Sequence, residues 1–194
     1  MCMHINSFAT NTKFIILMHP KEFKKVKNNT GRFTHLNLQN SEIFVGINFS
    51  NNQRINEIIA THDSYILFPS EDALNLTQEK PSQTQKNLAI FLIDSTWGCV
   101  NKMLKQSENL AKLKHMSFTT THKSIYDIKE QPGSKYLSTI ESTLVVLKLL
   151  DAYKIENIQK ERVEDFLNPF KAMIHYQKDL IQTANAKRFK QRSR

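Results

Sequence analysis

The sequence predicts an α/β fold in which a mostly parallel β-sheet is flanked by helices. Short apolar runs recur along the chain, helix-like segments separate them, and several of the runs are nearly continuous in apolar residues. Strands that are covered on both faces have such continuous apolar runs, whereas half-exposed strands alternate. The alternation of strands with helices is typical of a parallel sheet.

The predicted strands are rich in β-branched and aromatic residues, and they cover residues 13–18, 42–49, 64–69, 88–94 and 114–119. The helices expected between them cover residues 52–61, 70–76 and 97–106. In the second of these helices, Ser70 is a typical N-cap and Asp72 lies in the first turn. Residues 77–87 are polar and contain one proline, which predicts a surface loop.

The C-terminal part of the chain is predicted to be mostly helical. Ser138 or Thr139 is the expected N-cap of a helix, with Glu141 in the first turn and leucines following at helical spacing. Pro169 interrupts or begins a further helix. Residues 119–138 form a long loop for a compact domain, and loops of this length are commonly functional.

Length and composition indicate one domain over residues 1–186, followed by a basic and unstructured tail over residues 187–194. No apolar run approaches the roughly 18 residues of a membrane helix, and no secretory signal is visible. Cys2 and Cys99 are the only cysteines, so neither a disulfide framework nor a cysteine-rich zinc site is expected. We expect a cytoplasmic monomer without a metal.

The chain is strongly basic, with 27 Lys and Arg residues against 18 Asp and Glu residues and a net charge of +9. Two clusters carry much of this excess, one over residues 21–32 and one over residues 187–194. A polyanion is the usual partner of such clusters, because each phosphate contact releases condensed counterions. RNA and DNA both fit, and a solvated basic surface is the alternative.

Three segments place polar residues where predicted strands end and helices begin: "LFPSEDA", "LIDSTWG" and "KYLSTIE". In open α/β sheets, ligands bind outside the carboxyl ends of the strands, and helix N-termini favour anionic groups. We therefore expect a pocket formed by these three segments. The sequence contains neither a G-x-G-x-x-G nor a P-loop motif, which disfavours classical nucleotide binding.

"DSTW" at residues 94–97, followed by "NKML" at 101–104, resembles the signature of the DTW-domain family, whose members are similar to tRNA-uridine aminocarboxypropyltransferases. Further similar blocks follow the family order, namely "MHPKEFKKVKNNTGR" (18–32), "GINF" (46–49), "ILFPSEDA" (66–73) and "SIYDIKEQPGSKYLSTIES" (124–142). The resemblance covers about residues 14–180. Ser95 stands where the family usually has Gly, and Lys129 stands where it has Arg, which removes bidentate phosphate recognition.

The resemblance implies a SPOUT-like fold with a topological knot at the cofactor site. It also implies transfer of the 3-amino-3-carboxypropyl group of S-adenosylmethionine to N3 of a uridine in the tRNA variable loop, with release of methylthioadenosine. Many bacterial relatives carry an N-terminal cysteine cluster that is expected to hold zinc, and this chain lacks it. No metal and no membrane contact are implied.

The resemblance also implies the site residues. The catalytic residues would be Asp94, Thr96 and Trp97. The cofactor would lie against Pro69, Ser70, Asp94, Trp97, Leu137, Ser138, Thr139 and Glu141. The RNA would contact His19, Lys21, Lys24, Lys25, Arg32, Lys123, Lys129 and Arg188.

Several roles remain open from the sequence. Asp94 would deprotonate the uridine or position its uracil edge, and Trp97 would stack on a base, cover the sulfonium or simply pack against the helix. Glu141 would bind the amino group of the cofactor or complete a capping box. The alternative functions are the same transfer to rRNA, methylation by a SPOUT-type enzyme, and an inactive RNA-binding domain.

Overall fold

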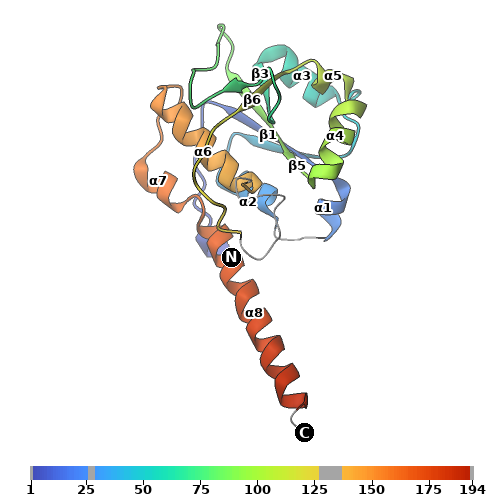
Figure 1. The fold of residues 1–194 in the computed structure, drawn as a ribbon. Coiled ribbons are helices and arrows are strands. Elements are labelled where there is room, and N and C mark those ends of the chain that lie inside the picture. The colour runs from blue at the N-terminus through green and yellow to red at the C-terminus, as the bar shows by residue number, and fades with distance from the viewer. Residues whose placement is uncertain (1, 26–28, 127–136, 193–194) are drawn as a thin grey trace.

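The described strands form a six-stranded sheet in which every pair of neighbours is parallel, in the order β2-β1-β5-β3-β6-β4 (Figure 1). The strands are β1 (Lys13–Met18), β2 (Ser41–Val45), β3 (Asp63–Leu67), β4 (Leu74–Asn75), β5 (Leu88–Asp94) and β6 (Lys114–Ser117). The α/β class with a parallel sheet is confirmed. The knot stays a prediction.

The structure is a computed structural model that describes residues 2–25, 29–126 and 137–192. For Cys2, Lys25, Trp97 and residues 184–192 it describes the backbone alone. After a short 3-10 helix at Cys2–His4, the helices are α1 (Pro20–Lys25), α2 (Thr30–Asn37), α3 (Gln53–Thr61), α4 (Trp97–Gln106), α5 (Glu108–Ala111), α6 (Thr139–Ala152), α7 (Lys160–Asp165) and α8 (Asn168–Arg192).

The two central strands, β1 and β5, are buried on both faces, which explains their nearly continuous apolar sequences. Alternate side chains of β1 enter two different cores. Phe14 and Ile16 pack in the core that includes residues of α2, α6 and α8, whereas Ile15 and Leu17 pack in the core that includes residues of α3, α4 and α5. The helices therefore form a layer on each face of the sheet (Figure 1).

The prediction of a helix over residues 70–76 is wrong. Residues 71–72 form a turn, and Leu74–Asn75 form β4, which pairs in parallel with β6. The Leu76 N–H then donates to the Ser117 carbonyl at 2.8 Å, and the Leu76 side chain is fully buried. A short helix leaves most of its backbone groups unpaired, whereas pairing with an existing strand satisfies them at once.

The C-terminal helix α8 begins at Asn168 with Pro169 in its first turn, which is one of the two positions expected for that proline. Its first turns pack in the core through Phe170 and Met173, and the rest projects from the body of the molecule (Figure 1). The backbone of the helix continues to Arg192. The division of the chain into a domain over 1–186 and a basic tail stays a prediction. In the described part of the chain, no helix is long and apolar enough to cross a membrane.

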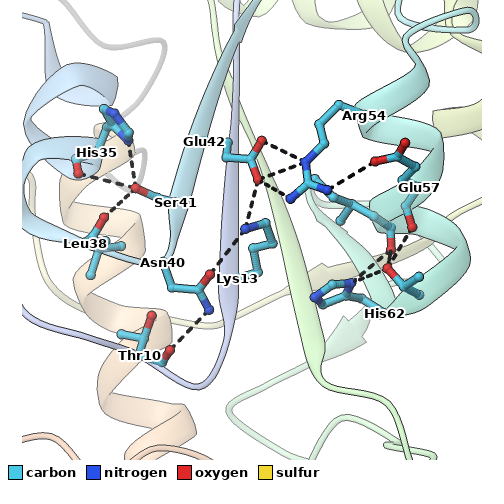
Figure 2. A network of polar contacts seen from close by, with 12 residues as sticks. Thr10, Lys13, His35, Leu38, Asn40, Ser41, Glu42, Arg54, Glu57 and His62 are labelled. Carbon is cyan, nitrogen blue, oxygen red and sulfur yellow. Dashed lines mark hydrogen bonds and ion pairs between the residues drawn. The ribbon is translucent and has the colours of Figure 1, made fainter.

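A polar network lies at the amino end of the edge strand β2 (Figure 2). The Glu42 carboxylate accepts hydrogen bonds from Arg54 at 2.9 Å and forms an ion pair with Lys13 at 2.9 Å. Arg54 also pairs with Glu57 across one turn of α3 at 3.2 Å. The network ties α3 to the two strands and places charge along the sheet edge, which opposes pairing with another strand.

Candidate functional site at the carboxyl ends of β1 and β5

The connections that follow β1 and β5 leave the sheet in opposite directions. From β1 the chain passes through α2 to β2 on one side, and from β5 it passes through α4 and α5 to β6 on the other. α2 and α4 cover opposite faces of the sheet. Adjacent strands with this arrangement define a topological switch point, where open α/β sheets bind ligands.

Asp94 ends β5 at this switch point and pairs in register with Met18, the last residue of β1. Its side chain is only 7% exposed. The Thr139 hydroxyl, in the first turn of α6, donates to Asp94 Oδ1 at 2.8 Å. On the other side, a β-carbon added to Gly31 in the first turn of α2 would lie 2.5 Å from Asp94 Oδ2. The first turns of two helices, α2 and α6, therefore flank the carboxylate.

His19, which follows β1, lies beside Asp94 through its backbone: its N–H donates to the Asp94 carbonyl at 3.1 Å. We expected His19 to contact RNA, but its side chain is buried, with 5% exposed. Nδ1 accepts a hydrogen bond from the Lys21 N–H at 3.1 Å, so the neutral ring carries its proton on Nε2. His19 is thus held at the switch point as a hydrogen-bond donor.

The segment Asn29–Thr30–Gly31 sets the position of α2 against Asp94. The Asn29 side chain caps α2 by accepting from the Arg32 N–H at 2.9 Å, and its amide donates to Met18 Sδ at 3.3 Å. Asn29 therefore fixes the start of α2 to the end of β1, and the missing side chain of Gly31 lets the helix approach the carboxylate. Neither role was predicted from the sequence, although the asparagine before a helix start is a signal that could have revealed the first.

Glu141 in α6 is buried and organises the long loop that precedes that helix. Its carboxylate accepts hydrogen bonds from the Ser138 N–H at 2.9 Å, the Ser138 hydroxyl at 2.6 Å, the Ser124 hydroxyl at 2.8 Å and the Ile125 N–H at 2.7 Å. The first of these bonds is the one that the glutamate contributes to a capping box, which is one of the two roles predicted for Glu141 from the sequence. Glu141 thus holds residues 124–125 against the start of α6.

The held loop reaches helix α1 and the C-terminal helix. The Tyr126 ring packs edge-on against Phe170 of α8, with centroids 5.1 Å apart. Burial raises the pKa of the Tyr126 hydroxyl, and the negative charge of Glu22 in α1 raises it further. Tyr126 therefore ties the loop to the C-terminal helix, and the charge of Glu22 acts on its hydroxyl.

Helix α4 starts at Trp97, three residues after Asp94. Ser95 is half-buried, and its hydroxyl has no hydrogen-bond partner among the described residues. Thr96 is the N-cap residue of α4 and is exposed, and its side chain makes no capping bond. Trp97 is the first residue of α4, but its side chain lies outside the described atoms. A buried hydroxyl without a partner, next to an open helix N-terminus, fits the polar end of a ligand.

Of the other residues expected at the cofactor site, Pro69 and Ser70 lie exposed beyond β3 at the same sheet edge. Register places them there, since Leu67 pairs with Leu92, two residues before Asp94. Leu137 is half-buried, before α6. Across the described ranges, no three His, Cys, Asp or Glu side chains gather to hold a metal ion.

The residues expected to contact RNA fall into three groups. Lys21 and Lys24 are exposed on α1, Lys123 is exposed in the long loop, and Arg32 is half-buried in α2. Lys25 and Arg188 lie in helices, but their side chains are outside the described atoms, and Lys129 is outside the described residues. Lys21 and Lys24 thus lie on α1 and Arg32 on α2, the two helices that follow β1.

A family model described as the DTW domain matches residues 1–178. The chain is 25% identical over 176 residues to tRNA-uridine aminocarboxypropyltransferase 2 of Drosophila melanogaster, covering 88% of this chain and 66% of the relative. The proteins of the same name from Mus musculus and Macaca fascicularis are 27% and 26% identical, over 89% and 86% of this chain and 57% and 55% of their own lengths. The chain thus spans less than two thirds of these curated relatives.

Proposed function

This chain belongs to the DTW domain family, as its motifs predicted, and from that membership we propose that it modifies a uridine of tRNA. The proposed reaction transfers the 3-amino-3-carboxypropyl group of S-adenosylmethionine to uridine N3 in the variable loop. The observation that carries the proposal is the position of Asp94, buried at the switch point within the DSTW motif. The shared name of the relatives supports the same activity.

Asp94 is the proposed general base. Uridine N3–H is a weak acid, so its attack on carbon requires that the proton be removed as the new bond forms. The Thr139 hydroxyl donates to Asp94 Oδ1 at 2.8 Å and so holds the carboxylate at the switch point, where the proton would be taken up. A positioned base of this kind contributes about 10²–10⁴-fold to the rate.

The residues around α4 and α6 fit S-adenosylmethionine. The buried Ser95 hydroxyl without a partner among the described residues and the exposed Thr96 are the proposed donors to its methionine end. Pro69, Ser70 and Leu137 would line its other sides, and Trp97 would stack on it or on the uracil. When bound, the cofactor supplies an electrophilic carbon and leaves as methylthioadenosine.

Two residues expected at the cofactor have their oxygens engaged within the protein. The Ser138 hydroxyl donates to Glu141, and the Glu141 carboxylate accepts four hydrogen bonds. We therefore assign Glu141 to the positioning of residues 124–125 and of the start of α6, rather than to the amino group of the cofactor. Their contribution to the site is to fix Thr139, the neighbour of Ser138, against Asp94.

The tRNA would lie over α1 and the long loop. Lys21, Lys24 and Lys123 are exposed there, and their ammonium groups would pair with phosphates on either side of the target uridine. The net charge of +9 fits this partner.

The test is the mass of the modified nucleoside. Purified protein is incubated with S-adenosylmethionine and either an unmodified tRNA transcript or unmodified rRNA, and the digested nucleosides are identified by mass spectrometry. A uridine carrying the aminocarboxypropyl group is expected. A methylated nucleoside would instead identify a methyltransferase, and an adduct on rRNA alone would identify a different substrate. Retained RNA binding without any adduct would overturn the transferase and identify an inactive RNA-binding domain.

A further inference from the structure

Phe23 and Arg32 form an exposed cation–aromatic pair beside the candidate site. Phe23, in α1, is 44% exposed although it is a large aromatic residue. The Arg32 guanidinium carbon lies 4.5 Å from the centre of the Phe23 ring, and Arg32 Nη2 donates to the Phe23 carbonyl at 3.4 Å. The Arg32 N–H in turn donates to Asn29 at 2.9 Å. The guanidinium is therefore held over one face of the ring.

The pair lies next to the proposed base. Arg32 directly follows Gly31, whose missing β-carbon faces Asp94 Oδ2. Phe23 lies four residues after His19, whose backbone N–H donates to the Asp94 carbonyl, and the Phe23 N–H donates to the His19 carbonyl at 3.2 Å. Both halves of the pair are thus connected to Asp94 through a short, hydrogen-bonded stretch of chain.

The surroundings of the pair are cationic. Lys21 and Lys24 are exposed on the same short helix as Phe23. Glu22 is the acidic residue of that helix, but it is half-buried and its charge acts on Tyr126. An exposed aromatic ring with a guanidinium against it and lysines on either side has the chemistry of a single-stranded nucleic-acid site, where bases stack and phosphates pair with cations.

We propose that the Phe23–Arg32 pair stacks an unpaired nucleobase of the RNA substrate and so holds the target uridine at Asp94. The proposal rests on the proposed function and adds to it a site for a second base of the same RNA strand. The stacked base would neighbour the target nucleotide, because the pair lies beside Asp94 and not against it. Any base has a face that can stack, so the site would fix the strand without selecting its sequence.

Three variants separate stacking from charge and from folding. Phe23→Leu keeps the apolar bulk and removes the aromatic face, whereas Phe23→Trp enlarges that face. Arg32→Lys keeps the charge and loses the planar guanidinium. Since Phe23 is exposed, its variants are expected to melt at the temperature of the parent protein.

The readout is the dissociation constant for oligouridylate and for a fully paired RNA duplex, at several salt concentrations. Loss of one stacked base is expected to weaken oligouridylate binding about tenfold in Phe23→Leu. The salt slope, which is the slope of the logarithm of the binding constant against the logarithm of the salt concentration, should not change. Phe23→Trp should bind as tightly as the parent or more tightly. Binding of the duplex should not change, because its bases are stacked on each other.

Lys21→Gln and Lys24→Gln are the charge controls. Each should lower the salt slope by about 0.7 for a single strand, which no Phe23 variant should do. The stacking site would be overturned if Phe23→Leu bound oligouridylate as tightly as the parent protein. It would also be overturned if Phe23→Leu and Phe23→Trp lost the same affinity, or if Phe23→Leu lost as much affinity for the duplex as for oligouridylate.

The tRNA transcript separates this inference from the proposed function. If the parent protein forms the aminocarboxypropyl adduct but Phe23→Leu has the parental KM for tRNA, only the stacking site fails. If the parent forms no adduct while Phe23→Leu loses oligouridylate binding, the proposed function fails and the stacking site stands.

Discussion

Gly31 and Asp94 approach so closely that a β-carbon at Gly31 would lie 2.5 Å from Asp94 Oδ2 and 2.8 Å from its carboxyl carbon. Real β-carbons do not tolerate such distances, so the glycine is required by the space that the acid occupies. A third neighbour, the Ile16 side chain, would lie at 3.1 Å and closes that space on the side of the sheet. The start of α2 and the end of β5 are therefore fitted to each other.

Gly31→Ala should displace the Asp94 carboxylate. Overpacking of this kind costs about 1–3 kcal/mol, and the transfer rate should fall much more than the stability, because the proposed base moves. Chemical denaturation and single-turnover rates would measure the two effects. Gly98→Ala is the matched control for stability, since a β-carbon at Gly98 meets nothing within 4 Å and alanine is the better helix residue. A parental rate in Gly31→Ala would contradict the fit.

Asp94→Asn should lower the transfer rate about 10²–10⁴-fold while the protein still folds. The asparagine oxygen can still accept the Thr139 hydroxyl, but the amide cannot take the proton from uridine N3. The rate should be measured with saturating tRNA, and binding of tRNA should be retained. Thr139→Ser, which keeps the hydroxyl, is the companion variant. An Asp94→Asn protein that transfers at the parental rate would exclude Asp94 as the base.

Glu141→Gln should destabilise the protein by about 3 kcal/mol, because one amide oxygen cannot replace a carboxylate that accepts four hydrogen bonds. Faster hydrogen exchange at the Ile125 amide should accompany the lower stability. Glu164→Gln removes the same charge from an exposed pair with Lys160, which is worth about 0–1 kcal/mol. Equal stabilities of the two variants would exclude the organising role of Glu141.

Glu42→Gln should change how the stability depends on pH. The hydrogen bond from Arg54 holds the pKa of the Glu42 carboxyl below its usual value, and Lys13 lowers it too, although partial burial acts in the opposite direction (Figure 2). A depressed pKa in the folded state stabilises the fold above the unfolded-state pKa, about 4.3, and this contribution is lost as the pH falls through the lower folded-state pKa.

Urea midpoints measured between pH 7 and pH 3 would show this. The parent protein should lose more stability below about pH 4.3 than Glu42→Gln does. Arg54→Gln, which removes the first partner of the carboxylate, should also flatten the curve. Identical pH profiles in all three proteins would rule out a contribution from this network.

Replacement of the four Lys and Arg residues between 187 and 192 by Gln should weaken tRNA binding and flatten its salt dependence. Each phosphate contact that is lost should lower the salt slope by about 0.7–0.9. Because α8 is helical to Arg192, the projecting helix would carry these charges along the RNA as an extended arm. Gln191→Ala is the neutral control in the same helix. An unchanged slope would mean that the arm does not contact the tRNA.

Sequence reasoning located most of the sheet. The strand at 88–94 and the helix at 97–106 match β5 and α4 at both ends, since a continuous apolar run that meets a polar junction has few alternative structures. It missed α1 and α2, which are short and carry many polar residues. Their signals were local, a proline at the first position of α1 and an asparagine before α2.

The sequence by itself determined the class of fold, the family and the point at Asp94 where the apolar strand meets the polar motif. The spacing of apolar residues and the order of the motifs are properties of the chain alone. Only the tertiary structure decided which groups surround that carboxylate. Thr139 and Gly31 come from segments 45 residues after and 63 residues before Asp94 in the sequence, and no local pattern links them. The parallel register of β1 with β5 places the segment that follows β1 beside Asp94, and the Thr139 hydroxyl reaches the same carboxylate from α6.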